Sequence, residues 1–340
     1  MSGVVGPSAA GAAATSAQPA APAATGAVPA GLASPEWGGF DPKRARGQDA
    51  RDHWQAFGTA TRLGWQMEAN WTDPLLFFIY SVAKPLSAAL ILVVMLDIIS
   101  GGADPAYRAF VVVGTALWAV VLAGIAGPAW SILDDRERYR MLKYIYVSPS
   151  DFIVTLLGRG LARLAVGTMG GLITITVGVI WLGVPFDPGV VDWPLLAVVL
   201  ALGVVAIIAI GLMLAAICLQ TRQESWSYPE AMAGALFLVS GVVFPLSVLP
   251  TPVQALGLVT PLTWWVEGVR HAVFPAGQSS VGGPASLWTD VTGTAAPDPL
   301  TIVLALLGTG ALVTLAATGV FRVSERRAKD RGLLDQTTGS

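Results

Sequence analysis

Residues 244–268 read FPLSVLPTPVQALGLVTPLTWWVEG. The segment is too apolar for an ordinary surface loop, yet it contains four prolines, Pro245, Pro250, Pro252 and Pro261. Proline removes a backbone N–H and clashes with the preceding turn, so the segment cannot form one straight helix. At membrane depth, non-helical backbone must be buried in protein or line a cavity. We therefore expect a pair of short helices over residues 250–274 that turns back within the outer leaflet of a membrane.

The composition also points to lipid as the solvent. The chain has 340 residues, of which 54% are hydrophobic and 12% are charged, whereas soluble domains carry about 25% charged residues. The net charge of −2 gives no reason to expect a nucleic-acid partner. A single cysteine, Cys218, excludes a disulfide framework within the chain and a cysteine-based metal site. Neither histidine has metal-ligand spacing, so we expect no cofactor and no metal on this chain.

Six segments are apolar and long enough to cross a hydrocarbon core, which needs about 20 residues of helix. They cover residues 75–99, 108–132, 153–183, 193–220, 226–246 and 299–322. A further full span beginning at Val253 is disfavoured, because Pro261, Glu267 and Arg270 would interrupt it. The predicted fold is an all-α membrane protein with six transmembrane helices and a re-entrant outer helix pair between spans five and six.

The basic residues predict the orientation of these spans. With six spans, 17 of the 20 lysines and arginines fall on one side, and the others are Lys84, Arg108 and Arg270. Because cytoplasmic loops are enriched in lysine and arginine, that side is expected to be the cytoplasm, together with both termini. The expected location is a bacterial plasma membrane.

The flanks of the membrane domain, residues 74–325, differ in composition. Residues 1–50 are mostly small residues and proline, which predicts a disordered cytoplasmic tail. Residues 51–73 place Trp54, Phe57 and Trp65 on one helical face, as an amphipathic helix in the membrane interface does. Residues 326–340 form a second predicted cytoplasmic tail.

The loop between spans two and three reads DDRERYRMLKYIYVSPSD, residues 134–151. Asp134 and Arg138 are spaced i,i+4, which favours a short charged helix, and Leu142 belongs to an apolar side of it. From the residues alone, a solvated loop and a docking helix for a cytosolic partner are equally compatible with this pattern.

Two stretches of the chain resemble one known family, the ABC type-2 exporter permeases. The loop segment ERYRMLKYIYVSPSDFIVTLLGRG is similar to the family's acidic block, with matches at Glu137, Arg138, Leu142, Ser148 and Pro149. The run FPLSVLPTPVQALGLVTPLTWWVEGVR is similar to its second block, with matches at Phe244, Pro245, Leu249, Pro250, Pro261, Leu262, Thr263, Glu267 and Arg270. Departures are Tyr139–Arg140 in place of Gly–Thr and Thr260 in place of Asn. The resemblance covers roughly residues 51–325.

The resemblance implies that the chain is the membrane half of an ATP-driven exporter. It implies that residues 51–73 form a connecting helix and that the loop forms a coupling helix docked in an ABC ATPase subunit. The implied coupling residues are Asp134, Glu137, Arg138, Leu142, Ser148 and Pro149. The re-entrant pair would form an outer gate, which the resemblance assigns to Pro245, Pro250, Pro261, Glu267 and Arg270.

The chain itself is not expected to be an enzyme. None of its four lysines follows the glycine spacing of a Walker A motif, so ATP and Mg²⁺ are expected on the partner subunit. A second permease copy, or a homologous permease, would be needed to enclose a pathway between two membrane halves.

Lys84 is the most conspicuous charge within a predicted span. A charge there costs several kcal/mol unless it faces the bundle interior or water, so it is a candidate for the substrate path, with snorkelling beside Pro85 as the alternative. Trp118 and Phe244 are further path candidates, although core packing is the favoured explanation for both. Glu267 and Arg270, spaced i,i+3, are interpreted as a structural ion pair rather than as substrate contacts.

The sequence therefore predicts an exporter permease for a hydrophobic or amphipathic substrate, such as a drug, an antibiotic or a lipid. Export of a polysaccharide or glycolipid is the alternative. A secondary transporter or channel that needs no ATPase is a second alternative, and it would predict several ionisable groups within the membrane. A membrane enzyme would need a cluster of histidines, cysteines or carboxylates, which the sequence does not suggest.

Overall fold

The computed structural model describes residues 42–69, 79, 83, 86–87, 90–91, 93–95, 98, 105–147, 151–221, 227–275 and 277–331. The chain divides into two units, Met1–Arg46 and Gly47–Ser340, and the fold below is that of the second. Every element in the described ranges is helical. Residues 1–41 of the predicted tail, most of the first predicted span and Lys84 lie outside the described residues.

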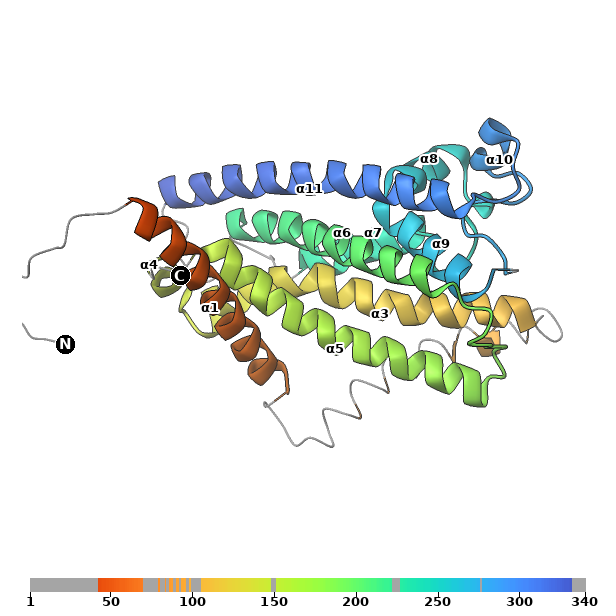
Figure 1. Ribbon diagram of the computed structural model, residues 1–340, viewed down its shortest axis with the longest axis horizontal. Helices are drawn as coiled ribbons and strands as arrows, with labels where there is room; N and C mark the ends of the chain where they lie inside the picture. Colours follow the sequence, from red (N-terminus) through yellow and green to blue (C-terminus); the bar gives the residue numbers. More distant parts are fainter. Residues whose placement is uncertain are drawn as a thin grey trace, which may run out of the picture. The chain divides into compact units, whose positions relative to one another are not determined.

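Five long helices and a 13-residue helix account for most of the described chain (Figure 1). The six are α1 (Pro42–Ala69), α3 (Pro105–Leu133), α5 (Phe152–Trp181), α6 (Trp193–Gln220), α7 (Ser227–Val239) and α11 (Pro299–Asp330). The remaining elements are η1 (Asp134–Arg138), α4 (Leu142–Val147), η2 (Leu246–Val248), α8 (Thr251–Val259), α9 (Pro261–Val273, also 13 residues) and α10 (Leu287–Thr292). Helix α1 begins at Pro42, within the predicted tail, since proline fits the first turn of a helix.

Four of the described helices are long and apolar enough to cross a membrane. They cover Tyr107–Arg138, Phe152–Trp181, Trp193–Gln220 and Pro299–Asp330, and they correspond to four of the six predicted spans. The aspartates that precede three of them, Asp151, Asp192 and Asp298, each accept a hydrogen bond from a backbone N–H of the first turn. Such N-caps satisfy donors that a helix leaves free at its start, which explains why the predicted and observed starts agree.

The fifth predicted span, 226–246, was wrong in its extent. Helix α7 ends at Val239 and has 13 residues, or about 20 Å at 1.5 Å per residue, which is short of a hydrocarbon core. The chain turns at Ser240 and Gly241, and Gly241 has φ +68°, a left-handed conformation that commonly ends a helix. The apolar residues that follow do not continue α7 but form the turn before η2.

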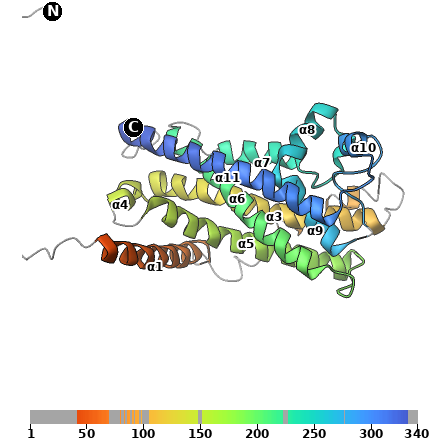
Figure 2. The ribbon, with the colours of Figure 1, turned by 45° about the horizontal axis from the view of Figure 1, so that its top comes forward.

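Helix α6 lies at the centre of the packing. It contacts α3, α9 and α11, and Figures 1 and 2 show it between α3 and α11. Leu117, Val121 and Ile125 of α3 share a buried core with Ile207 and Leu214 of α6. The bundle has an η1 end, where η1 and α4 lie, and an α10 end, where α8 and α10 lie (Figure 1).

Helices α3 and α5 approach each other closely through glycines. A Cβ atom at Gly167 would stand 2.3 Å from Ala123 Cβ, and one at Gly171 would stand 2.7 Å from the Ala116 carbonyl oxygen. These two glycines form a GxxxG pattern, which permits close contact of membrane helices. The same pattern therefore fixes the position of α5, whose first turns carry the coupling-site arginines described below.

The predicted outer pair corresponds to α8 and α9, which meet at Thr260. Pro250 precedes α8, and Pro261 is the first residue of α9, where its missing N–H leaves no helical hydrogen bond unmade. Helix α9 is buried along most of its length and packs on α6 and α11. Two short helices are thus present where the prolines predicted them, while their depth in a membrane stays a prediction.

Candidate coupling site

The loop predicted to couple to a partner begins as a π-helical extension of α3. In η1, the N–H of Tyr139 donates to the carbonyl of Asp134 over 2.8 Å, the i→i+5 spacing of a π-helix. Arg140 then adopts φ 52° and reverses the chain into α4. A non-glycine residue in this region is uncommon, so the surrounding contacts must hold the turn.

Two buried ionic residues of η1 hold the turn to neighbouring helices. Asp135 pairs with Arg159 in the second turn of α5, and both side chains are less than 10% exposed. Arg136 donates through Nη1 to the carbonyls of Cys218 (3.1 Å) and Thr221 (2.8 Å) at the end of α6. Carbonyls at a helix C-terminus lack partners within the helix and favour a cation. η1 is therefore bonded to both α5 and α6.

A third arginine extends this network to α1. The Nη2 of Arg163 lies 2.9 Å from Asp134 Oδ2, and its Nε lies 2.5 Å from Glu68 Oε1. Helices α1 and α5 also touch through glycine, because a Cβ at Gly158 would stand 2.8 Å from the Phe57 carbonyl oxygen. We use the name coupling network for Glu68, Asp134, Asp135, Arg136, Arg159 and Arg163.

The outer surface of the loop is polar and exposed. Glu137, Arg138, Tyr139, Arg140 and Met141 are exposed, and Tyr144 has 65% of its surface exposed. Leu142 is 1% exposed and belongs to a buried cluster with Ile132, Phe152 and Phe321. The exposed residues can contact another protein, whereas Leu142 anchors the start of α4 to the bundle.

The sequence predicted the position of this loop but only some of the residues that bond it to the neighbouring helices. Asp134, Glu137 and Arg138 lie in η1 as neighbours, Leu142 lies beneath them, and Ser148 and Pro149 lie outside the described residues. Asp135, Arg136, Arg159, Arg163 and Glu68 were missed as site residues. The available signal was the i,i+4 pair of Arg159 and Arg163 at the start of an apolar span, where uncompensated charges are costly.

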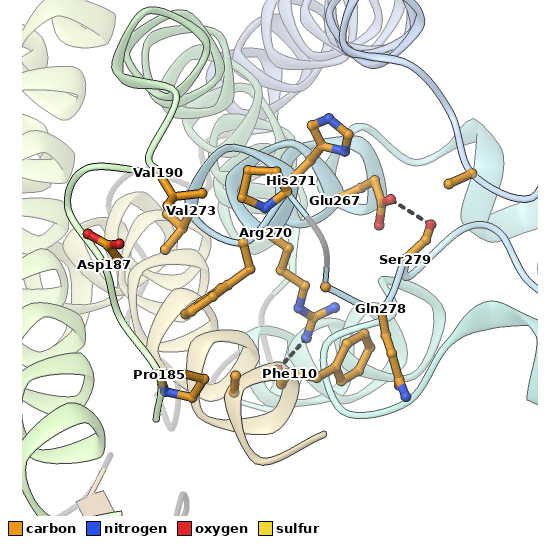
Figure 3. A pocket seen from close by; sticks show the side chains of 15 residues that line it. Phe110, Pro185, Asp187, Val190, Glu267, Arg270, His271, Val273, Gln278 and Ser279 are labelled. Atoms are coloured by element: carbon orange, nitrogen blue, oxygen red, sulfur yellow. Dashed lines mark hydrogen bonds between the residues drawn. The ribbon is translucent and has the colours of Figure 1, made fainter. Parts of the chain in front are cut away.

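At the α10 end, Glu267 and Arg270 are both buried, but they are not an ion pair. Although both lie in described residues, no ion pair joins them; Glu267 instead accepts hydrogen bonds from Ser279 Oγ (2.6 Å) and the Ser280 N–H (2.5 Å) (Figure 3). Arg270 donates to the carbonyls of Gly241, Val242 and Phe110, and to the Ser280 hydroxyl. The expectation of a structural role is consistent with these bonds, and the expected pairing was wrong because backbone acceptors surround the guanidinium.

The remaining candidates lie within packed regions. Trp118 and Phe237 form an edge contact with ring centroids 5.0 Å apart, and both pack against the main core. Phe244 is half-buried in the turn before η2, and Pro245 directly precedes η2. Trp118 lies midway along α3, whereas Phe244 and Pro245 lie next to η2, which packs on α8 at the α10 end.

A comparison with models of protein families identifies the family of this chain. Residues 59–274 match the family model described as ABC-2 type transporter. The chain belongs to the ABC-2 type transporter family. A search of curated proteins found no significant match to the chain. The matched range begins in α1 and ends after α9, so it contains the whole coupling network.

As an ABC-2 type transporter chain, the protein is a membrane-spanning permease component rather than a catalytic domain. ABC-2 permeases normally work with an ATP-binding subunit. The four apolar helices agree with a multi-pass membrane protein. Within this family assignment, the coupling network lies where the resemblance placed the contact with that subunit.

Proposed function

We propose that this chain is the permease subunit of an exporter that moves a hydrophobic or amphipathic substrate out of a bacterial cell. A separate ABC ATPase subunit binds ATP and Mg²⁺ and docks on residues Glu137 to Met141 and on Tyr144. Two permease copies enclose the substrate path, and the η1 end faces the cytoplasm. The class of substrate is supported by the apolar, charge-poor helices, since a charged cargo would need polar groups along its path.

The coupling network is the observation that carries this proposal. Arg136 joins η1 to the C-terminus of α6, Asp135 joins it to Arg159 of α5, and Arg163 joins it to α1. The backbone of η1 continues from α3. A displacement of the exposed loop by a partner therefore moves the ends of four helices together. A solvated loop without a partner would not need three buried or half-buried arginines beneath it.

The first test is co-purification of the full chain with a candidate ABC ATPase, followed by ATPase and transport assays in liposomes. Glu137→Arg reverses an exposed charge and also removes the bond that Glu137 Oε1 accepts from Arg136 Nη2 over 3.0 Å. Through these two changes it is expected to lower substrate-stimulated ATPase activity by about tenfold, which corresponds to about 1.4 kcal/mol. Asp330→Arg is the matched control, because Asp330 is an exposed acidic residue at the end of α11.

The expected result is a stable complex that is weakened by Glu137→Arg and unaffected by Asp330→Arg. A chain that moves solute in liposomes without any ATPase would instead make it a secondary transporter and would overturn the proposal. Equal loss of activity in both variants would also contradict docking at η1, because the effect would then reflect general surface charge.

A further inference from the structure

The outward side of α11 changes from apolar to basic near the end of the helix. Residues 299–321 contain no charged residue, whereas residues 322–331 contain five basic and two acidic ones. Leu304 and Leu315 are 56% and 74% exposed. They precede Arg322 by 18 and 7 residues, which are whole or nearly whole numbers of helical turns. The basic end of α11 therefore continues the side of the helix on which these leucines are exposed.

The length of the apolar stretch places this change at the edge of the hydrocarbon. Helix α11 is one of the four described helices that are long and apolar enough to cross a membrane. Residues 299–321 rise about 34 Å at 1.5 Å per residue, and a hydrocarbon core is about 30 Å thick. When α11 crosses the bilayer, Arg322 and Arg326 therefore lie at the level of the headgroups, and Arg331 lies about 14 Å beyond Arg322.

The guanidinium groups of Arg322 and Arg326 are available to a ligand. Both side chains are exposed, and they lie one turn apart on the same side of α11. The ion pair in this part of the helix joins Lys329 to Glu325 over 2.7 Å, and neither arginine pairs with a carboxylate among the described residues. Arginine binds phosphate through two parallel hydrogen bonds. The pair therefore presents two phosphate-binding groups at the depth where phospholipids carry their phosphates.

A second copy of the chain would not complement this side of α11. In a symmetric dimer the same surface meets itself, so a contact centred on Arg322 and Arg326 would bring two basic segments together against their mutual repulsion. Anionic headgroups, in contrast, attract basic segments that directly follow a membrane helix. Both the apolar and the basic part of the surface are then covered by one kind of partner.

We propose that Arg322 and Arg326 bind the phosphate of an anionic phospholipid in the leaflet at the η1 end, with its acyl chains along the exposed leucines of α11 (Figure 1). On the inward side of the same turns, Phe321 and Ala328 belong to the buried cluster that contains Leu142. The bound lipid therefore holds the end of α11 against the residues beneath the coupling loop. This site goes beyond the proposed function, because lipid binding requires neither the ATPase subunit nor transport.

Native mass spectrometry of the full chain in detergent tests this proposal. Phosphatidylglycerol and phosphatidylcholine with identical acyl chains are added in equal amounts. The expected result is a preference for phosphatidylglycerol of about tenfold, since each basic residue near an anionic headgroup contributes about fivefold in affinity. The double variant Arg322→Gln/Arg326→Gln should lose most of this preference. Equal binding of the two lipids by the unchanged chain, or an unchanged preference in the double variant, would overturn the proposal.

The matched control is Arg327→Gln/Arg331→Gln, which removes the same charge from the same helix. Both residues are exposed, but Arg327 lies about 100° further round α11 than Arg326, away from the side of the exposed leucines. This variant should keep its preference for phosphatidylglycerol. If both double variants lose the preference equally, the binding reflects general attraction to positive charge and not a site at Arg322 and Arg326.

Two further measurements separate other ligands of the same surface. A large excess of soluble glycerol 3-phosphate should not displace phosphatidylglycerol, because it has no acyl chains for the apolar side of α11. Full displacement would make this a site for soluble phosphates. Arg322→Gln/Arg326→Gln should also still co-purify with the ATPase subunit. Loss of that complex, with the lipid preference unchanged, would assign this side of α11 to the ATPase subunit and contradict the lipid site.

Discussion

Asp135 and Arg159 form a buried ion pair between η1 and the second turn of α5, 24 residues apart in the chain. Their side chains are 7% and 6% exposed, respectively. Removal of one partner from such a pair leaves an uncompensated charge, which typically costs about 3–5 kcal/mol, whereas replacement of both by apolar residues is often neutral. The pair thus allows stability and coupling to be measured separately.

We expect Asp135→Leu and Arg159→Met, made singly, to lower the thermal unfolding midpoint of the detergent-solubilised chain strongly. The double variant should recover most of this loss, because neither charge of the pair is then left buried without its partner. In the complex with an ATPase subunit, the double variant should still hydrolyse ATP but transport less substrate per ATP. Full coupling in a stable double variant would limit the ion pair to a structural role.

The pair of Arg163 and Glu68 is more exposed, with side chains 21% and 26% accessible. For this pair we expect a small effect on stability and a larger effect on coupling to the ATPase subunit. Glu68→Gln should change the free energy of unfolding by only about 0–1 kcal/mol, as partly exposed pairs do, because Arg163 keeps its bond to Asp134. It should nevertheless weaken the hold of α1 on α5 and reduce coupling. Glu325→Gln is the control, since it breaks the Glu325–Lys329 pair within α11. Equal effects of the two variants on coupling would contradict a specific role for Glu68.

The contact between α1 and α5 depends on the absence of a side chain at Gly158. In Gly158→Ala, the new Cβ would stand 2.8 Å from the Phe57 carbonyl oxygen and 2.9 Å from Ala60 Cβ, so α1 must move away. Tryptic cleavage at Arg62 should become faster. Gly58→Ala is the matched control, because a Cβ there meets no described atom within 4 Å and favours the helix. Cleavage that is unchanged by Gly158→Ala would show that α1 is not held by this contact.

The packing of α9 on α6 can be tested with one methyl group. A Cβ at Gly203 would stand 1.9 Å from Trp265 Cδ1, and Trp265 is 1% exposed. Gly203→Ala should therefore destabilise the protein by about 1–3 kcal/mol, as overpacking does. Gly308→Ala in α11 meets no described atom within 4 Å and should stabilise by up to about 1 kcal/mol. Thermal unfolding of both variants in one detergent makes the comparison, and a stable Gly203→Ala protein would contradict the packing.

The start of a helix could be predicted from the sequence where an aspartate directly precedes an apolar run. Asp192 precedes α6 and Asp298 precedes α11, so both starts were predicted correctly. The end of α7 was missed because Ser240 and Gly241 lie within a continuous apolar run, and hydropathy does not register a left-handed glycine.

The bonds of the coupling network were harder to predict from the sequence, because the residues that they join are distant in the chain. Arg136 and Thr221 are 85 residues apart, and their contact exists only because α3 and α6 pack side by side. Composition indicates that a buried arginine needs acceptors, but it does not identify backbone carbonyls as those acceptors. The same reason explains why Glu267 and Arg270, although neighbours on α9, do not pair with each other but bond to partners outside α9, among them Ser280, which both contact.

The continuity of α3 with η1 has a mechanical consequence for the whole permease. Residues 105–138 form 34 consecutive helical residues, or about 50 Å of rod at 1.5 Å per residue. One end is pinned by Asp135 and Arg136, and near the other the Phe110 carbonyl is pinned by Arg270. Pro128 is the proline in the interior of α3, as distinct from Pro105 at its first position, and marks where such a rod bends. A displacement of η1 must therefore either bend α3 at Pro128 or strain the hydrogen bond between Arg270 and the Phe110 carbonyl at the other end of the helix.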